Sequence, residues 1–278
     1  MANYTAADIK ALRERTGAGM MDVKKALDEA NGDAEKAIEL IRIKGLKGAT
    51  KREGRSTAEG LVAAKVVGNV GVMVEVNCET DFVAKSDKFI AVANTVLTTA
   101  IESGAADLET LLATEVDGKP LSELVIEEGA ILGEKVVVRR LARVEGAIVD
   151  AYLHKTSKDL PAQVGVLFAV EGEGEAAAAV AHDVAVHVAA MAPNYLTRED
   201  VPAELVESER RIAEETAKAE GKPEAAMSKI VEGRVTGFYK GEVLVDQAFA
   251  KDAKKTVAKV LEEAGVTAKA VARFRVGA

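Results

Sequence analysis

The residues most able to do covalent chemistry are one cysteine and three histidines, and their spacing does not support an enzyme. His182 and His187 lie five positions apart on an expected helix, about 140° around its axis, so they do not share a face as metal ligands would. Cys78 lies beside Glu79 and Asp81, whose negative charges would raise the thiol pKa and weaken the nucleophile. We therefore predict no catalytic residues and no metal site.

Nucleotide-dependent chemistry also lacks its usual sequence signals. The chain contains neither a P-loop pattern nor a G-x-G-x-x-G pattern, so no glycine-rich loop is predicted to hold phosphates. We expect no cofactor and no covalent chemistry by this chain itself. An enzyme with an unrecognised site is the weakest alternative, and binding to another protein is the first function to consider.

The stretch best suited to protein binding is a polar turn, Cys78-Glu79-Thr80-Asp81-Phe82-Val83. Before it, valines at 70, 72, 74 and 76 alternate with other residues and predict a half-buried strand. After it, apolar residues from Phe89 to Ala100 recur at spacings of three and four and predict an amphipathic helix. A turn between two such elements lies at the surface on a rigid support, which suits an interaction site.

A purely structural interpretation of the same turn is also open. Thr80 could be only a helix N-cap, with Asp81 as a first-turn charge matched to the helix dipole. Phe82 could then be a plug at the edge of the core, since most aromatic residues near strand ends are buried. The residues alone favour this interpretation over a binding site.

Composition and charge limit the class of protein. With 278 residues, of which 48% are hydrophobic, the chain can form two or more domains. Its net charge of −8 argues against general binding to nucleic-acid backbones, and the short basic run 44–55 is predicted to be a solvated linker. It has no signal-peptide pattern, no apolar run long enough to span a membrane and a single cysteine. We expect a cytoplasmic protein without direct nucleic-acid or membrane contact.

The N-terminal part, residues 5–48, predicts a compact three-helix bundle similar to ubiquitin-associated domains. Thr5 and Asp8 form the capping-box pattern that begins its first helix. Met20 and Met21 are neighbours, about 100° apart on a helix, so both cannot face one small core. We expect one of them on a different face, where a methionine side chain suits adaptable protein contact.

The central part is predicted to be a duplicated unit of a hairpin followed by a long helix. Glu59-Gly60 and Val70-Gly71-Val72 mark the first copy, and Glu145-Gly146 and Val164-Gly165-Val166 mark the second. Hairpins followed by helices indicate antiparallel sheets with helices on one face, an α+β arrangement. The matching points are 86 and 94 residues apart, which places an eight-residue insertion in the second turn. Between the copies we expect helix over 107–133 and a strand over 135–144.

A helical arm is predicted to interrupt the second copy. Leu205, Ile212 and Ala219 repeat every seven residues, and Met227, Ile230 and Val231 give the returning helix a thin apolar seam. This pattern predicts an antiparallel coiled-coil arm that could self-associate. After it we expect a strand over 242–249, a helix over 251–264 and a last strand. The predicted domains are 1–54 (bundle with basic linker), 55–144 (first core half), 145–198 with 237–278 (second core half, discontinuous) and 199–236 (arm).

Two motifs resemble the bacterial elongation factor Ts family: N-C-E-T-D-F-V-A-K at 77–85 and L-R-E-R-T-G-A-G-M-M-D-V-K-K-A-L at 12–27. The resemblance implies a guanine-nucleotide exchange factor that binds elongation factor Tu, speeds GDP release and allows GTP to reload. It implies that Phe82 inserts near the partner's Mg²⁺ site and that Asp81 disturbs the hydrogen bonds there. Thr80 and Val83 would shape and anchor this tip.

The resemblance also implies two further contacts with the partner. Arg13, Met20, Met21 and Lys24 would dock on its nucleotide-binding domain, and His154 would contact another of its domains. The residues leave open a different class of protein, in which the bundle binds a ubiquitin-like or peptide ligand while the arm oligomerises the chain. That alternative gives Asp81 and Phe82 no role beyond packing.

Overall fold

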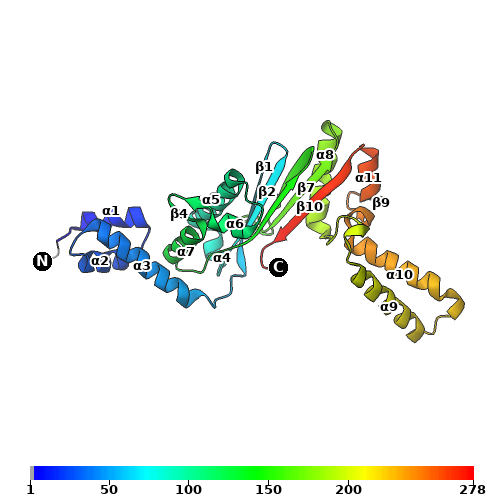
Figure 1. Cartoon of the computed structure of the whole chain (residues 1–278), viewed down its shortest axis with the longest axis horizontal. Helices are drawn as coiled ribbons and strands as arrows, with labels where there is room; N and C mark the ends of the chain where they lie inside the picture. The colour runs from blue at the N-terminus through cyan, green and yellow to red at the C-terminus, as the bar shows by residue number, and fades with distance from the viewer. Residues whose placement is uncertain (1–2) are drawn as a thin grey trace.

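The computed structural model describes residues 3–278, apart from the side chains at positions 46, 47 and 49–51. It is a mixed helix and antiparallel-sheet protein, as the α+β prediction required. Figure 1 shows an elongated molecule with a three-helix bundle at one end, two sheets with their helices in the middle, and a helical hairpin at the other end. Within the described residues, no helix combines the length and the apolar character needed to cross a membrane.

The bundle consists of α1 (Ala6–Thr16), α2 (Met20–Glu29) and α3 (Ala34–Arg52). The predicted capping box is confirmed, since the backbone N–H of Thr5 donates to Asp8 Oδ2 at 2.7 Å. Leu12, Val23 and Leu27 are almost completely buried and form the centre of its small core.

The predicted linker at 44–55 is largely wrong, because α3 runs on to Arg52. The cause is tertiary packing of α3 on α7 (Leu121–Leu132), which outweighs the low helix propensity of the glycines. A Cβ at Gly45 would lie 3.0 Å from Ala130 Cβ, so the glycine permits this close approach. The side chains of Lys47 and Lys51, part of the predicted basic run, lie outside the described part.

The first sheet has the order β1-β2-β5, with strands Glu59–Val67, Val70–Cys78 and Val137–Glu145. The short helix α4 (Asp81–Ala84) follows β2, and α5 (Asp87–Ser103), α6 (Leu108–Ala113) and α7 pack on one side of the sheet. Between α6 and α7 the predicted continuous helix over 107–133 is wrong. A small hairpin, β3 (Glu115–Val116) with β4 (Lys119–Pro120), intervenes. Asp117 and Gly118 both take positive φ there, as a tight hairpin turn requires.

The second sheet repeats this plan with the order β10-β7-β6, the strands being Thr267–Arg275, Val164–Glu171 and Ile148–His154. The long helix α8 (Glu175–Met191) and the shorter α11 (Val257–Glu263) cover its outer face. The last strand, β10, pairs with β7 across the whole length of that strand. The predicted hairpin-plus-helix unit is therefore present twice.

The two sheets pack face to face, which the sequence did not predict. Met73 and Leu167 are completely buried between them, and Phe274 is nearly so. Gly71 and Gly165 are equivalent positions of the two copies. A Cβ would lie 2.8 Å from Val149 Cγ1 at the first and would overlap Val62 Cγ1 at the second. The prediction that β2 is half-buried is therefore wrong, because its second face meets the other sheet.

The helical hairpin comprises α9 (Ala203–Ala219) and α10 (Met227–Glu242). Its seam contains Ala213, Val231 and Val235, with Val206, Met227 and Tyr239 at its edges. The predicted stripe of Leu205, Ile212 and Ala219 is wrong, since Ile212 is 49% exposed. Val206 and Ala213 are also seven residues apart, so the heptad spacing alone could not choose between the two stripes.

The segment after the hairpin also differs from its prediction. Instead of a strand over 242–249, α10 ends at Glu242, a 3₁₀ turn covers Leu244–Asp246 and only the short β8 (Ala248–Phe249) is extended. Val243 and Leu244 are adjacent and both fully buried, which a strand with one buried face does not allow. The predicted helix over 251–264 is shortened by β9 (Asp252–Thr256), which pairs with β8 before α11 begins.

Candidate partner-binding site

The polar turn 79–83, here called the tip, is mounted directly on the end of β2. Thr80 is the N-cap of α4, and its hydroxyl accepts a hydrogen bond from the Val83 N–H at 3.4 Å. Asp81 is the acidic residue of the first turn, so these two parts of the structural interpretation are confirmed. Ser86 then caps α5, and its hydroxyl accepts from the Phe89 N–H at 3.3 Å. Two capped helices within a few residues leave this stretch of backbone little freedom.

Phe82 does not belong to the core. Its side chain is 73% exposed, which is the highest value among the exposed large hydrophobic residues in the described part of the chain. Ala84, two positions further on, is completely buried. Lys85 Nζ lies 4.5 Å from the centroid of the Phe82 ring and 3.7 Å from an Asp81 oxygen. The interpretation of Phe82 as a core plug is therefore wrong, and the ring stands in solvent beside an Asp–Lys pair.

Glu134 fixes the tip from a distant part of the sequence. Its Oε2 accepts hydrogen bonds from the N–H groups of Glu79 and Thr80 at 3.0 and 3.1 Å, and its Oε1 accepts from the Thr80 hydroxyl at 2.5 Å. In return, the Lys135 N–H donates to Glu79 Oε1 at 2.6 Å. Hydrogen bonds to a charged carboxylate are stronger than neutral ones, so this reciprocal arrangement holds the tip firmly.

Sequence reasoning missed Glu134, which lies two residues after the end of α7. Gly133 takes a left-handed conformation (φ 79°) as the C-cap of that helix and turns the chain toward the tip. The only local signal was this glycine after an apolar helical run. Nothing near Glu134 in the sequence indicates which turn its carboxylate meets.

Cys78 is buried beneath the tip. Burial, followed by the negative charge of Glu134, raises the pKa of its thiol to about 12. The direction agrees with the prediction, although burial contributes more than neighbouring carboxylates. The thiol donates to the Thr80 carbonyl oxygen at 3.3 Å, so it supports the tip rather than acting as a nucleophile.

The methionines of the bundle form a second exposed surface. Met20 and Met21 are 58% and 61% exposed, and Arg13 and Lys24 are exposed on the same small bundle. The prediction that both methionines cannot face the small core is confirmed, and neither side chain is buried. Both lie in the first turn of α2, before its core-facing residues Val23, Ala26 and Leu27.

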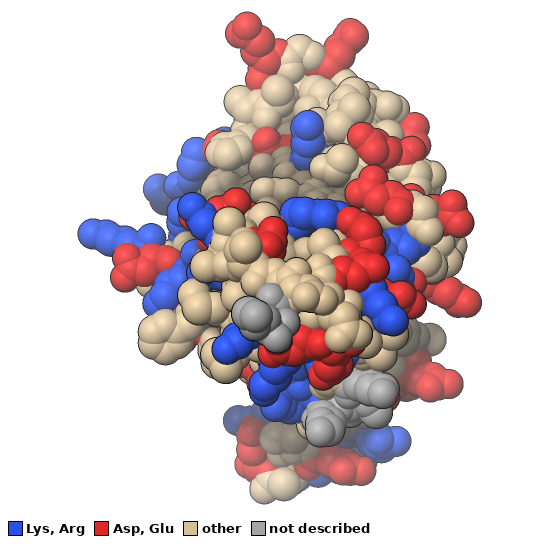
Figure 2. Space-filling view, turned by 90° about the vertical axis from the view of Figure 1, so that its left-hand side faces the viewer, with Lys and Arg blue, Asp and Glu red and all other residues tan. Residues whose placement is uncertain are grey.

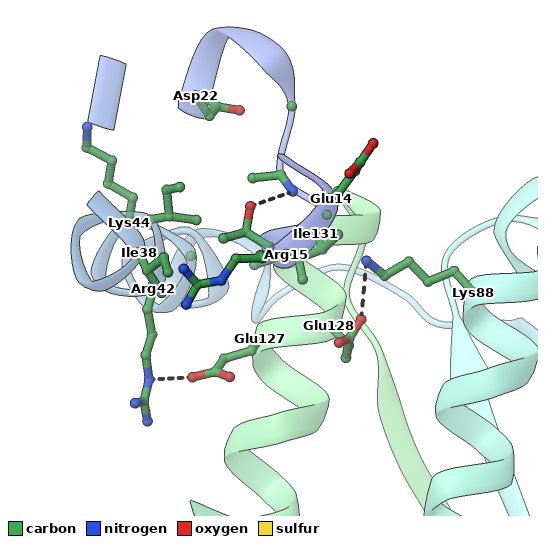
Figure 3. A pocket seen from close by; sticks show the side chains of 18 of the residues that line it. Glu14, Arg15, Asp22, Ile38, Arg42, Lys44, Lys88, Glu127, Glu128 and Ile131 are labelled. Carbon is green, nitrogen blue, oxygen red and sulfur yellow. Dashed lines mark hydrogen bonds and ion pairs between the residues drawn. The ribbon is translucent and has the colours of Figure 1, made fainter. Parts of the chain in front are cut away.

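The bundle is attached to the core through α7 (Figure 3). Arg42 of α3 pairs with Glu123 and Glu127 of α7, and Lys88 of α5 pairs with Glu128 at 3.6 Å. All of these side chains except that of Glu123 line a crevice of about 800 Å³ between the bundle and the core. The helix that bears the bundle therefore leads directly into Glu134, which holds the tip.

The histidines do not come together. His154 is exposed at the end of β6, where its Nδ1 lies 3.1 Å from the Tyr152 hydroxyl. His187 is buried, bonded to Gln247 at 2.9 Å, and burial lowers its pKa. His182 instead contacts Asp150 at 3.2 Å. In the described part of the chain, no group of three or more histidine, cysteine or acidic residues could hold a metal ion.

Among the described residues, the end of the molecule that carries the bundle shows no surface of a single charge. Figure 2 shows Lys and Arg interspersed with Asp and Glu over this face. Several are paired, including Arg15 with Glu35 at 3.0 Å and Lys44 with Glu29 at 2.7 Å. A mixed face of this kind is typical of protein contact rather than of a phosphate backbone.

Comparison with known proteins identifies the family of the chain. The family model described as "Elongation factor TS" matches residues 79–278. Proteins named "Elongation factor Ts" from Paenarthrobacter aurescens (strain TC1) and Arthrobacter sp. (strain FB24) are 90% and 88% identical over 277 residues, with 100% of both chains covered. The protein of that name from Micrococcus luteus is 73% identical over the same length. The chain belongs to the elongation factor Ts family.

Proposed function

We propose that this chain is a guanine-nucleotide exchange factor for elongation factor Tu. It binds the GDP-bound partner, accelerates GDP release and dissociates when GTP reloads, without covalent chemistry of its own. The observation that carries the proposal is Phe82, a large aromatic ring 73% exposed on a capped and hydrogen-bonded support. Family membership supports the same function. The site of action is the cytoplasm, where translation takes place.

The proposed mechanism is a reciprocal coupling of two binding equilibria. An exchange protein that binds the nucleotide-free partner more tightly than the GDP-bound partner must weaken the affinity of the partner for GDP by the same ratio. GTPases hold their nucleotide through backbone amides, a lysine and Mg²⁺. Phe82 and Asp81 would disturb the Mg²⁺ and phosphate elements, while Thr80 and Val83 keep the tip in place.

The bundle supplies a second contact in this proposal. Arg13, Met20, Met21 and Lys24 would dock on the nucleotide-binding domain of the partner, and His154 would contact another of its domains. Exposed methionines suit this role because their flexible side chains adapt to a partner surface. The support is that all five side chains are exposed, with the methionines more than half so.

The test is release of a fluorescent GDP from purified elongation factor Tu, with and without this protein. The expected result is strong acceleration by the wild type. The alternative, a module that binds a ubiquitin-like or peptide ligand and oligomerises through its arm, predicts no acceleration by a folded wild-type protein. That outcome would overturn the proposal.

A further inference from the structure

A groove adjoins the tip at the edge of the first sheet. It has a volume of about 450 Å³ and lies between β1, α5 and the loop 155–162 that joins β6 to β7. Lys85, whose ammonium group stands over the Phe82 ring, is one of its lining residues. The groove and the tip therefore form one continuous surface.

The loop that builds this groove is the insertion noted in the second copy. In the first copy, Gly68 and Asn69 alone connect β1 to β2, whereas the second hairpin has the longer loop between His154 and Val164. The loop is anchored on the edge of β1, because the Val62 N–H donates to the Ala162 carbonyl oxygen at 2.8 Å. Val276 N–H donates to the neighbouring Gln163 carbonyl oxygen at 2.9 Å. The insertion thus has a defined position and closes one side of the groove.

The groove has an apolar floor and a positive rim. Leu61, Ile90 and Leu97 form part of the floor, and Leu153 adds a side chain that is 40% exposed. The charged lining residues are three lysines, Lys85, Lys155 and Lys158, and one acid, Asp159. In the part of the chain that the structure describes, neither Lys155 nor Lys158 forms a salt bridge.

We propose that this groove binds an acidic segment of the partner protein, with an aliphatic side chain of that segment on the apolar floor. The inference rests on the proposed function and extends its contact surface beyond the tip. Three observations carry it: the net positive rim in a chain of net charge −8, the exposed Leu153, and continuity with Phe82 through Lys85. Positive and negative surfaces that meet at an interface steer association and fix its register.

The two parts of the groove predict different kinetic effects. Charges at the rim of an interface act mainly on the association rate and its salt dependence. Apolar contacts act mainly on the dissociation rate. Lys155 and Lys158 should therefore influence association, and Leu153 should influence dissociation.

The experiment measures binding of the full-length protein to nucleotide-free elongation factor Tu by stopped flow at several salt concentrations. The double variant Lys155→Glu, Lys158→Glu is compared with Lys65→Glu, Lys254→Glu, which makes the same charge change at two exposed lysines outside the groove. The expected result is an association rate lowered about tenfold at low salt by the groove variant only, with a flatter salt dependence. Leu153→Ser should raise the dissociation rate several-fold.

The outcomes separate this inference from the proposed function. An equal decrease of the association rate in the groove variant and the control variant would show a general electrostatic effect and would overturn the proposed groove. Wild-type association and dissociation rates in the groove variant and in Leu153→Ser would also overturn it. In both cases the wild type would still accelerate GDP release, so the exchange function would stand. A folded wild-type protein that neither binds nor accelerates GDP release would overturn both. Melting curves of each variant check that the fold is retained.

Discussion

Thr80 is bound to Glu134 by two hydrogen bonds, one from its backbone N–H to Oε2 at 3.1 Å and one from its hydroxyl to Oε1 at 2.5 Å. The two residues are 54 positions apart, so the contact joins the end of β2 to the end of α7. The candidate tip is thus held by the fold and not by its own sequence alone.

Glu134→Ala should loosen the tip without removing any residue that we propose to contact the partner. We expect a loss of unfolding free energy of about 1–3 kcal/mol, because two backbone N–H groups and one hydroxyl lose their acceptor. We also expect slower GDP release from elongation factor Tu at a temperature where the variant remains folded. Glu134→Gln keeps one acceptor oxygen, so its stability and its rate of GDP release should lie between those of the wild type and those of Glu134→Ala. Unchanged exchange in a measurably destabilised Glu134→Ala would contradict a positioning role.

Phe82→Ala should separate function from stability. With 73% of the side chain already in solvent, its removal should change the melting temperature little. The rate of GDP release should fall on the order of tenfold or more, as for an aromatic anchor of an interface. The matched control is Phe89→Ala, at a completely buried ring, which should cost about 3–5 kcal/mol of stability. A Phe82→Ala variant with full exchange activity would remove Phe82 from the site.

Met20→Ser combined with Met21→Ser should weaken binding of elongation factor Tu and leave the bundle folded. Both side chains are more than half exposed, so little apolar area returns to water on unfolding. Titration calorimetry would measure the dissociation constant, and circular dichroism would check helix content. Val23→Ser is the contrasting variant: that side chain is completely buried, and its replacement should unfold the bundle. Equal affinity of wild type and the double methionine variant would leave the bundle without a docking role.

The buried thiol of Cys78 should make stability fall at high pH. Its pKa is raised from 9.0 to about 12 in the folded protein, chiefly by burial. The contribution of the neutral thiol is therefore fully present below pH 9 and is lost as pH rises from 9 toward 12, because only the unfolded chain ionises easily there. Denaturant titrations of wild type and Cys78→Ala between pH 8 and 10.5 should converge with rising pH. A constant difference between them over that range would contradict the raised pKa.

The seam of the helical hairpin can be tested with two substitutions on different faces. Val231→Asp places a charge in the buried seam and should lower the melting temperature of the hairpin, since an unpaired buried carboxylate is strongly disfavoured. Ile212→Asp alters a side chain that is 49% exposed and should leave the melting temperature unchanged. Analytical ultracentrifugation of the same two proteins and the wild type would show whether the exposed stripe promotes self-association. The reverse order of stabilities would restore the stripe predicted from the sequence.

Local features of this chain could be predicted because they depend on neighbours in the sequence. The capping box of Thr5 and Asp8 and the repeated Val-Gly-Val at 70–72 and 164–166 are examples. The packing of one sheet on the other could not be predicted, because Glu75 and Asn77 gave the inner face of β2 a polar pattern typical of solvent. In the fold Glu75 is completely buried, and its Oε2 accepts from Arg140 Nε at 2.6 Å.

The candidate site also contains local features that the sequence could predict and others that depend on the fold. The tip residues 80–83 form a recognisable motif on one turn, but the residues alone favoured a buried Phe82, and only the fold places its ring in solvent. Glu134, the groove beside the tip and the exposure of both Met20 and Met21 depend on which segments meet in space. Heptad spacing was equally uninformative for the hairpin, because two stripes shared it.

The helix α7 has 12 residues, a length of about 18 Å at 1.5 Å per residue. Arg42 of the bundle pairs with its side, and Glu134 at its end holds the tip. For a partner that binds both the bundle and the tip, this helix acts as the spacer between two binding sites. Once the first contact has formed, a stiff spacer of matched length gives the second contact a high effective concentration. Affinity would then depend on the straightness and anchoring of a helix that carries none of the residues proposed to contact the partner.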